Sequence, residues 1–193
     1  MTNPLKLSNT FKTQKNKAID DKTINRYIGY FEDSFLISKA KRYDVKGKKY
    51  INSPYKYYFE DIGLRNARLN FRQTEENHVM ENIIYNELKF RGYNVDVGVV
   101  NIYTTDKNGK RILKNYEVDF IATQGSNKYY IQSAFSISNF EKLQQENNSL
   151  INIQDSFKKI IVVKDNIKPR HDENGITTIG IYNFLLNQNS LEL

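Results

Sequence analysis

Residues 116–135, YEVDFIATQGSNKYYIQSAF, carry the pattern of side chains that decides the fold. Polar and apolar residues alternate over 116–122 and again over 128–136, and alternation with a period of two is typical of β-strands. Between them, residues 124–127 have the glycine and polar content of a tight turn. A third alternating stretch precedes them at 93–99, continues over 102–104, and ends in a turn at 106–109. The sequence therefore predicts an antiparallel meander of three strands.

Helical periodicity flanks this meander on both sides. Residues 75–91 place Met80, Ile84 and Leu88 one turn apart, and Gly92 follows as a helix stop. After the meander we expect a helix over 139–148, a buried strand over 159–164, a last strand over 177–181 and a short helix over 184–186. Helices that alternate with blocks of strands predict an α/β (α+β) fold with a mixed sheet and flanking helices.

The N-terminal third has a different organisation. A short amphipathic helix is expected over 5–13 and a second from Asp21 or Thr23 to Phe31, with an apolar face of Ile24, Tyr27, Ile28 and Phe31. A polar hairpin around residues 46–48 follows. Two helices and then a basic hairpin is the order of a winged helix, in which the second helix can enter a major groove and the wing contacts phosphate. We therefore divide the chain into a winged-helix-like basic segment, 1–60, and a second domain, 61–193.

The positive charge is concentrated in the first segment. The chain has a net charge of +7, all of it within residues 1–60, because residues 61–193 are neutral overall. A concentrated positive field favours polyanions, with nucleic acid first and an acidic protein second. The alternative is a solvated basic surface or one that packs against a neighbouring domain. The candidate nucleic-acid contacts are Lys22, Asn25, Arg26, Lys46, Lys48 and Lys49.

Composition excludes several classes of protein. The chain has no cysteine and only two histidines, which excludes disulfides and thiolate sites and leaves hard cations on carboxylates as the metal option. A mean hydropathy of -0.68 and short apolar runs predict no membrane segment. We expect a cytoplasmic protein. The chain contains no Gly-x-x-x-x-Gly-Lys-Ser/Thr phosphate loop, so we expect no ATP binding by this chain and no cofactor in it.

The order of elements from residue 75 onward resembles the core of the PD-(D/E)XK restriction-endonuclease-like fold. In that family, acidic residues hold Mg²⁺ and a lysine two residues beyond the last of them assists the attacking water. The matching positions here are Glu81, Asp119 and Gln132, of which Glu81 and Asp119 would hold any metal. The lysine position is occupied by Ala134, and Lys128 lies about 13 Å from Gln132 along the strand. The resemblance thus predicts a degenerate site that is not catalytic, and a lysine supplied by the following helix, such as Lys142, would be needed to restore it.

A closer resemblance rests on specific stretches of sequence. KYYFEDIGLRNA (56–67), EVDFIA (117–122) and YYIQSA (129–134) are similar to the C-terminal domain of unknown function, 4143 type, found behind the P-loop domain of bacterial and archaeal AAA-type ATPases. This resemblance implies a degenerate nuclease module beside a winged helix, working with an ATPase domain in cis or in trans. It also carries the family's acidic positions onto Glu81, Glu117 and Asp119, and its glutamine onto Gln132.

Three functions remain open from the sequence. The leading interpretation is a non-catalytic accessory module that associates with nucleic acid, DNA in particular, or with a partner protein. The second is an active nuclease dependent on Mg²⁺ or Mn²⁺ that uses Glu81, Asp119 and Gln132. The third is a protein-interaction module whose basic face binds an acidic surface without nucleic acid.

Overall fold

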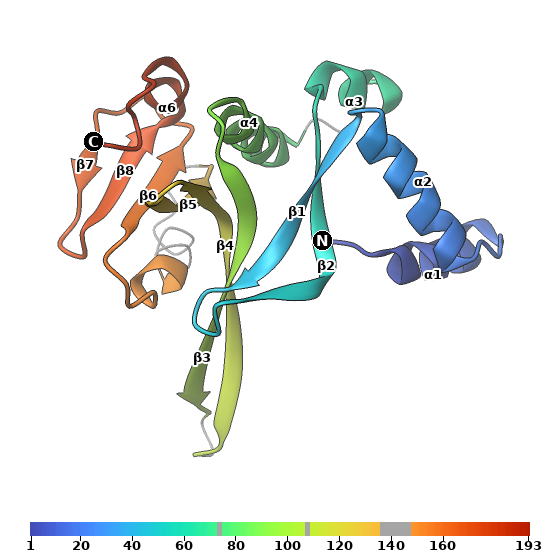
Figure 1. Ribbon diagram of the computed structural model, residues 1–193, viewed down its shortest axis with the longest axis horizontal. Helices are drawn as coiled ribbons and strands as arrows, with labels where there is room; N and C mark the ends of the chain where they lie inside the picture. Colours follow the sequence, from blue (N-terminus) through green and yellow to red (C-terminus); the bar gives the residue numbers. More distant parts are fainter. Residues whose placement is uncertain (73–74, 107–108, 136–147) are drawn as a thin grey trace. The chain divides into compact units, whose positions relative to one another are not determined.

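The computed structural model describes residues 1–72, 75–106, 109–135 and 148–193. They form a mixed α/β fold in which antiparallel strand pairs predominate (Figure 1). The chain divides into two compact units, residues 1–42 with 51–74 and residues 43–50 with 75–193. The first unit therefore extends past the boundary expected at residue 60. In the described ranges, no helix combines the length and the apolar character needed to cross a membrane.

The first unit contains the two helices expected from the sequence and a third, short helix. They are α1 (Pro4–Lys15), α2 (Asp21–Asp33) and α3 (Ile62–Arg68). The side chain of Asn3 caps α1 by accepting from the Lys6 N–H, and Asp61 caps α3 by accepting from the Leu64 N–H. Strands β1 (Ile37–Asp44) and β2 (Lys49–Phe59) form the predicted hairpin, and its end belongs to the second unit.

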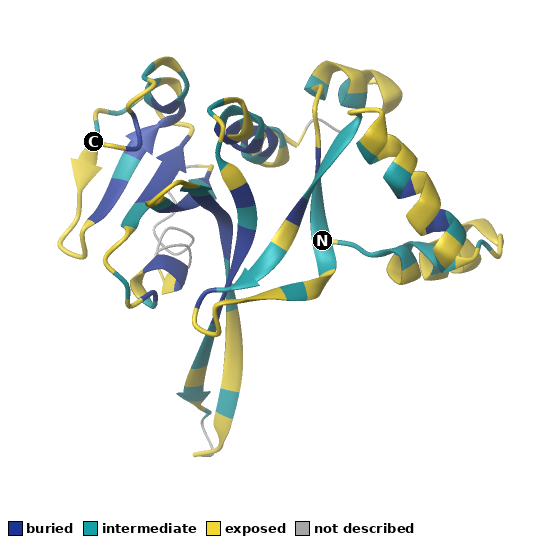
Figure 2. Cartoon of the chain, viewed as in Figure 1, coloured by how far each residue is buried: buried dark blue, intermediate teal, exposed yellow. Residues whose placement is uncertain are grey.

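The apolar face expected on α2 is only half buried. Ile24 and Ile28 are buried, whereas the side chains of Tyr27 and Phe31 remain 52% and 47% exposed. The four residues were expected to share one apolar face of the helix, and only the two isoleucines of that face are buried. A small unit has little apolar surface with which to cover a helix. Most of α2 therefore stays exposed (Figure 2).

The second unit contains the remaining elements. They are α4 (Glu76–Phe90), β3 (Asn94–Thr105), β4 (Arg111–Gln124), β5 (Asn127–Ala134), β6 (Lys158–Val163), β7 (Arg170–His171), β8 (Ile176–Gly180) and α6 (Ile181–Leu186). The strong helix predicted over 75–91 is α4, whose Ile84 and Leu88 are completely buried. The helix predicted over 139–148 falls almost entirely on residues 136–147, outside the described residues.

Within this unit the strands hydrogen-bond in the order β3-β4-β5-β6-β8-β7. The predicted meander is confirmed, because β3, β4 and β5 pair antiparallel. Strands β5, β6 and β8 then pair in parallel, and their side chains are buried almost without interruption. Parallel strands need cover on both faces, which explains the run KIIVV at β6.

An irregularity in the β3–β4 ladder lies next to the candidate site. Asp96 is opposite Ile121 and Gly98 is opposite Val118, so two β4 residues, Asp119 and Phe120, face the single intervening residue of β3. This is a β-bulge, a feature that redirects side chains. Gly98 is required there, because a Cβ at that position would lie 2.9 Å from the Cβ of Val118.

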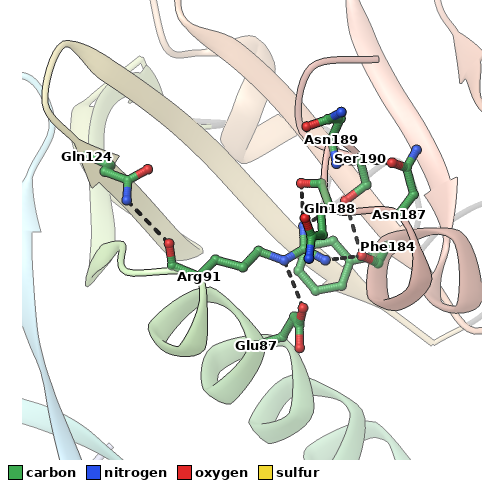
Figure 3. A network of polar contacts seen from close by, with 8 residues as sticks. All are labelled: Glu87, Arg91, Gln124, Phe184, Asn187, Gln188, Asn189 and Ser190. Atoms are coloured by element: carbon green, nitrogen blue, oxygen red, sulfur yellow. Dashed lines mark hydrogen bonds and ion pairs between the residues drawn. The ribbon is translucent and has the colours of Figure 1, made fainter.

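Arg91 joins the end of α4 to the C-terminal segment (Figure 3). Its Nε donates to Glu87 Oε1 at 2.8 Å, its Nη1 donates to Ser190 Oγ at 2.9 Å, and its Nη2 donates to the carbonyl of Phe184. The guanidinium also lies over the Phe184 ring, 4.8 Å from its centroid. These contacts hold the chain at Phe184 and Ser190 against the C-terminal end of α4.

The β3–β4 hairpin extends beyond the rest of its unit (Figure 1). Strand β5 pairs with β4 only from Phe120 to Gln124, whereas the β3–β4 ladder continues to Thr105 and Arg111. We call residues 101–106 and 109–115 the arm. Its side chains are exposed or half-buried throughout the described residues (Figure 2).

Candidate functional site

The structure brings Asp119 and Gln132 together at the point where β4 and β5 separate. Main-chain pairing of β4 with β5 ends at Phe120 and Ile131. Beyond this pair, the side chains of Asp119 and Gln132 connect the two strands. The Asp119 N–H donates to Gln132 Oε1 at 3.3 Å, and the Ser133 N–H donates to Asp119 Oδ2 at 3.1 Å. Both side chains are 8% exposed. They connect β4 and β5 beyond the last main-chain pair of these two strands, so part of their hydrogen-bonding capacity is used by the fold.

Ala134, at the position where the nuclease-like resemblance implies a lysine, is part of the hydrophobic core. Ala134 is 1% exposed, pairs with Val163 of β6 and packs in a cluster with Leu150 and Ile161. A methyl group there gives neither charge nor a hydrogen bond. Lys142, named as a substitute, lies outside the described residues.

The acidic residues expected around Asp119 do not form a metal centre in the part of the chain that is described. Glu81 lies on α4 and Glu117 on β4, and both are half-buried. No three Asp, Glu or His side chains among the described residues gather closely enough to hold a cation. Asp119 and Gln132 are two of the expected site residues, and the structure joins them directly.

The candidate contacts on α2 lie on the exposed side of that helix. Lys22, Asn25 and Arg26 are exposed, and the buried Ile24 and Ile28 are on the other side. The three side chains lie within the first two turns, where helix N–H groups also favour anions. They belong to the first unit, whereas the lysines of the hairpin end belong to the second unit.

The hairpin end, residues 43–50, holds its lysines in a fixed conformation. Val45 is buried in the core of the second unit and its N–H donates to the Val99 carbonyl at 3.0 Å. Asp44 Oδ1 accepts from the N–H groups of Lys46 and Gly47 at 3.1 and 2.9 Å. These contacts fix the turn at the end that leaves β1, while the lysine side chains stay exposed at Lys46, Lys48 and Lys49.

A second anchor lies at the other strand of the hairpin end. The Tyr50 hydroxyl donates to Asp96 Oδ2 at 3.0 Å, and its ring meets that of Tyr43 edge to face at 5.4 Å. Burial, followed by the charge of Asp96, raises the pKa of Tyr50. Tyr50 therefore stays protonated and keeps donating this hydrogen bond at neutral pH.

Beside the hairpin end lies a lysine that sequence reasoning did not assign to a site. Lys128 Nζ is 4.8 Å from the ring centroid of Tyr130, 5.2 Å from that of Phe157 and 5.9 Å from that of Tyr43. Asp155 Oδ2 is 3.9 Å from the same nitrogen. Burial lowers the pKa of Lys128, Asp155 opposes this shift, and the nearby charge of Lys48 adds to it.

An open cavity of about 340 Å³ adjoins this cluster. Its lining combines the hairpin end with the segment before β6, and consists of Val45, Lys46, Lys48, Ile153, Gln154 and Asp155. Lys128 and Tyr130 are two apart on one strand, so their common face was visible in the sequence. The approach of Asp155 to Lys128 was not visible in the sequence, because Asp155 comes from a loop 27 positions away.

Comparisons with known proteins place this chain beside proteins of unassigned function. A family model described as a domain of unknown function (DUF8612) matches residues 2–75. The match ends within one residue of the end of the first unit, at residue 74. An uncharacterized protein of Haemophilus influenzae is 33% identical over 186 residues, which is 96% of this chain and 42% of that protein. An uncharacterized protein of Methanocaldococcus jannaschii is 31% identical over 137 residues, which is 71% of this chain and 28% of that protein.

The chain spans less than half the length of these curated relatives. No solved structure matches it. The chain is therefore similar to a segment that recurs in a bacterium and in an archaeon, within proteins more than twice as long.

Proposed function

We propose that this chain is a non-catalytic accessory module that binds nucleic acid, DNA in particular, through the exposed lysines of the hairpin end. The observation that carries the proposal is the attachment of that hairpin end to the second unit. A flexible basic loop loses conformational entropy when it binds, whereas lysines on an anchored turn are already positioned. Three exposed ammonium groups within four residues concentrate positive charge at this turn, which favours a phosphate backbone.

The α2 residues are a separate set of proposed contacts, which belongs to the first unit. Lys22, Asn25 and Arg26 are exposed on a helix that precedes the basic hairpin, and this order supports a winged-helix role for α2 and the hairpin. In this proposal α2 approaches the major groove and the hairpin end contacts phosphates.

The proposal of a degenerate PD-(D/E)XK core rests on element order and on three positions. Helix α4, the meander β3-β4-β5 and the parallel strand β6 follow in the sequence expected for that fold. Asp119 and Gln132 lie together beside the position of Ala134, whose methyl group cannot assist a water molecule. A core of this kind would serve binding and not hydrolysis.

The length of the relatives supports a partner for this module. They contain more than half of their residues outside the matched segment. We propose that a P-loop ATPase domain, in cis or in trans, is that partner, as the resemblance of residues 56–67 and 117–134 implies. A complex with an ATPase that survives nuclease treatment, in a chain that binds no DNA, would favour the protein-interaction alternative instead.

Fluorescence anisotropy with a labelled duplex tests the proposal. The expected result is binding that weakens steeply with salt, and a smaller salt dependence for the variant Lys46→Gln/Lys48→Gln/Lys49→Gln. Each phosphate contact contributes about 0.9 to the slope of log K against log salt, so the slope should fall by about 2.7.

A matched control removes the same charge from another part of the unit. Lys89, Lys168 and Arg170 are exposed and lie outside the proposed interface, and their combined replacement by glutamine should leave most of the affinity intact. Equal losses in the two triple variants would reveal a general charge effect and overturn the assignment to the hairpin end. A wild-type chain that does not bind duplex DNA at low salt would overturn the function.

A further inference from the structure

The arm of the second unit is a two-stranded ribbon in which the described residues of β3 and β4 pair with each other as far as Thr105 and Arg111. Its register joins Asn101 with Asn115, Tyr103 with Leu113 and Thr105 with Arg111. Four residue steps at about 3.4 Å give the ribbon a length of roughly 14 Å. The major groove of B-DNA is about 12 Å wide and 8.5 Å deep and admits a two-stranded β-ribbon. The arm has the size of such a reader.

One face of the arm carries side chains suited to base edges. Residues of odd number share this face, and Tyr103 and Leu113 on it are 61% and 50% exposed. The guanidinium of Arg111 lies 4.0 Å from the centroid of the Tyr103 ring. Stacking fixes the plane of the guanidinium, and the donors of Arg then project along that plane, which is the geometry of a bidentate contact to guanine.

The charge of the arm complements a phosphate backbone. Among its described residues, Lys110, Arg111 and Lys114 are exposed cations, and Asp106 is the acidic residue. Asp106 is itself engaged in the turn, where its Oδ1 accepts from the Lys110 N–H at 2.8 Å. The excess of exposed cations over carboxylates gives the described part of the arm a net positive charge, which favours a polyanion.

The base of the arm is tied to the hairpin end through one carboxylate. Asn101 Nδ2 donates to Asp44 Oδ2 at 3.4 Å, while Asp44 Oδ1 holds the turn that carries Lys46. Both surfaces lie in the second unit and share this contact. A polyanion bound at the hairpin end would thus continue toward the arm.

We propose that the arm inserts into the major groove of duplex DNA, with Arg111 as its base-contacting residue and Tyr103 as the support of that arginine. The inference rests on the proposed function, because the hairpin end supplies the neighbouring phosphate contacts. It adds a sequence-reading element to a surface that otherwise contacts phosphate alone.

One substitution in the arm and one control substitution elsewhere in the unit test this proposal. Arg111→Gln should weaken binding to a guanine-containing duplex by at least about fivefold, the lower end of what one bidentate base contact gives. Arg170→Gln, an exposed arginine elsewhere in the unit, is the control and should retain wild-type affinity. On duplex RNA of the same sequence Arg111→Gln should have a smaller effect, because the A-form major groove is too narrow and deep to admit a side-chain reader.

A cross-linking experiment reports position independently of affinity. The chain has no cysteine, so Thr105→Cys provides a unique attachment point for a photoactivated aryl azide near the end of the arm. Labelled Thr105→Cys should cross-link to duplex DNA, and labelled Lys168→Cys should not.

The outcomes separate this inference from the proposed function. Wild-type affinity in Arg111→Gln, or absent cross-links from Thr105→Cys, together with a weakened hairpin-end triple variant, overturns the arm and leaves the function standing. A wild-type chain that binds no duplex DNA overturns both.

Discussion

Replacement of Arg91 should destabilise the second unit by several kilocalories per mole. Arg91→Met keeps most of the hydrocarbon volume of a side chain that is 9% exposed, and removes its donors to Ser190 Oγ and to the Phe184 carbonyl. Ser190 Oγ still donates to the Phe184 carbonyl at 3.1 Å, but both groups lose a hydrogen bond from a charged donor, which is worth about 1.5–3 kcal/mol, and Glu87, at 23% exposed, regains part of its hydration. We expect a loss of about 3 kcal/mol in the free energy of unfolding. For a chain of this size this corresponds to roughly 6–12 °C in melting temperature.

Urea unfolding followed by far-UV circular dichroism measures this loss. Lys89→Met, on the exposed last turn of the same helix, is the matched control and should change stability by less than about 0.5 kcal/mol. In a double-mutant cycle, Glu87→Gln should cost less in the Arg91→Met background than in the wild type, because the pair is already broken. Stability of Arg91→Met within about 0.5 kcal/mol of wild type would refute the view that this network holds the C-terminal segment.

Three further predictions follow from contacts described above. Gly47→Ala should weaken duplex DNA binding, since a Cβ at residue 47 would lie 2.6 Å from Asp44 Oδ2 and displace the carboxylate that holds the turn; unchanged anisotropy titrations would contradict this. In plasmid-nicking assays with Mn²⁺, wild type and Asp119→Ala should give the same background, and nicking that disappears in Asp119→Ala would show an active nuclease. Burial, followed by the charge of Glu32, raises the pKa of Tyr57 to about 12. The stability that the protonated Tyr57 contributes should therefore be complete below pH about 10 and should fall as the pH rises toward 12. Tyr57→Phe should reduce this loss of stability, measured as the change of the urea midpoint with pH.

The sequence predicted the local elements well because their signals are short-range. The spacing of Met80, Ile84 and Leu88 depends only on the helical repeat, and the buried α4 confirms it. Alternation around Asp119 and Gln132 predicted β4 and β5, and the glycine-containing turn between them predicted their antiparallel pairing. Asp119 and Gln132 were also expected to be neighbours, since a meander places them opposite one another.

The exposure of α2 was less predictable from sequence. Tyr27 and Phe31 repeat in phase with Ile24 and Ile28, and periodicity alone assigns all four to one face. Which of them is buried depends on the area that other elements of the first unit present to the helix. That area is a property of the assembled unit and has no signature within α2 itself.

By itself, the amino-acid sequence determined the strands of the meander, the long helix α4 and the basic hairpin. Only the tertiary structure decided that Gly98 permits a bulge beside Asp119, that Asp155 comes to Lys128, and that Asp44 connects the hairpin end with the arm through Asn101. Periodicity and turn chemistry act over a few residues, and the sequence displays them directly. Contacts between residues tens of positions apart arise from the packing of whole elements, so no local pattern records them.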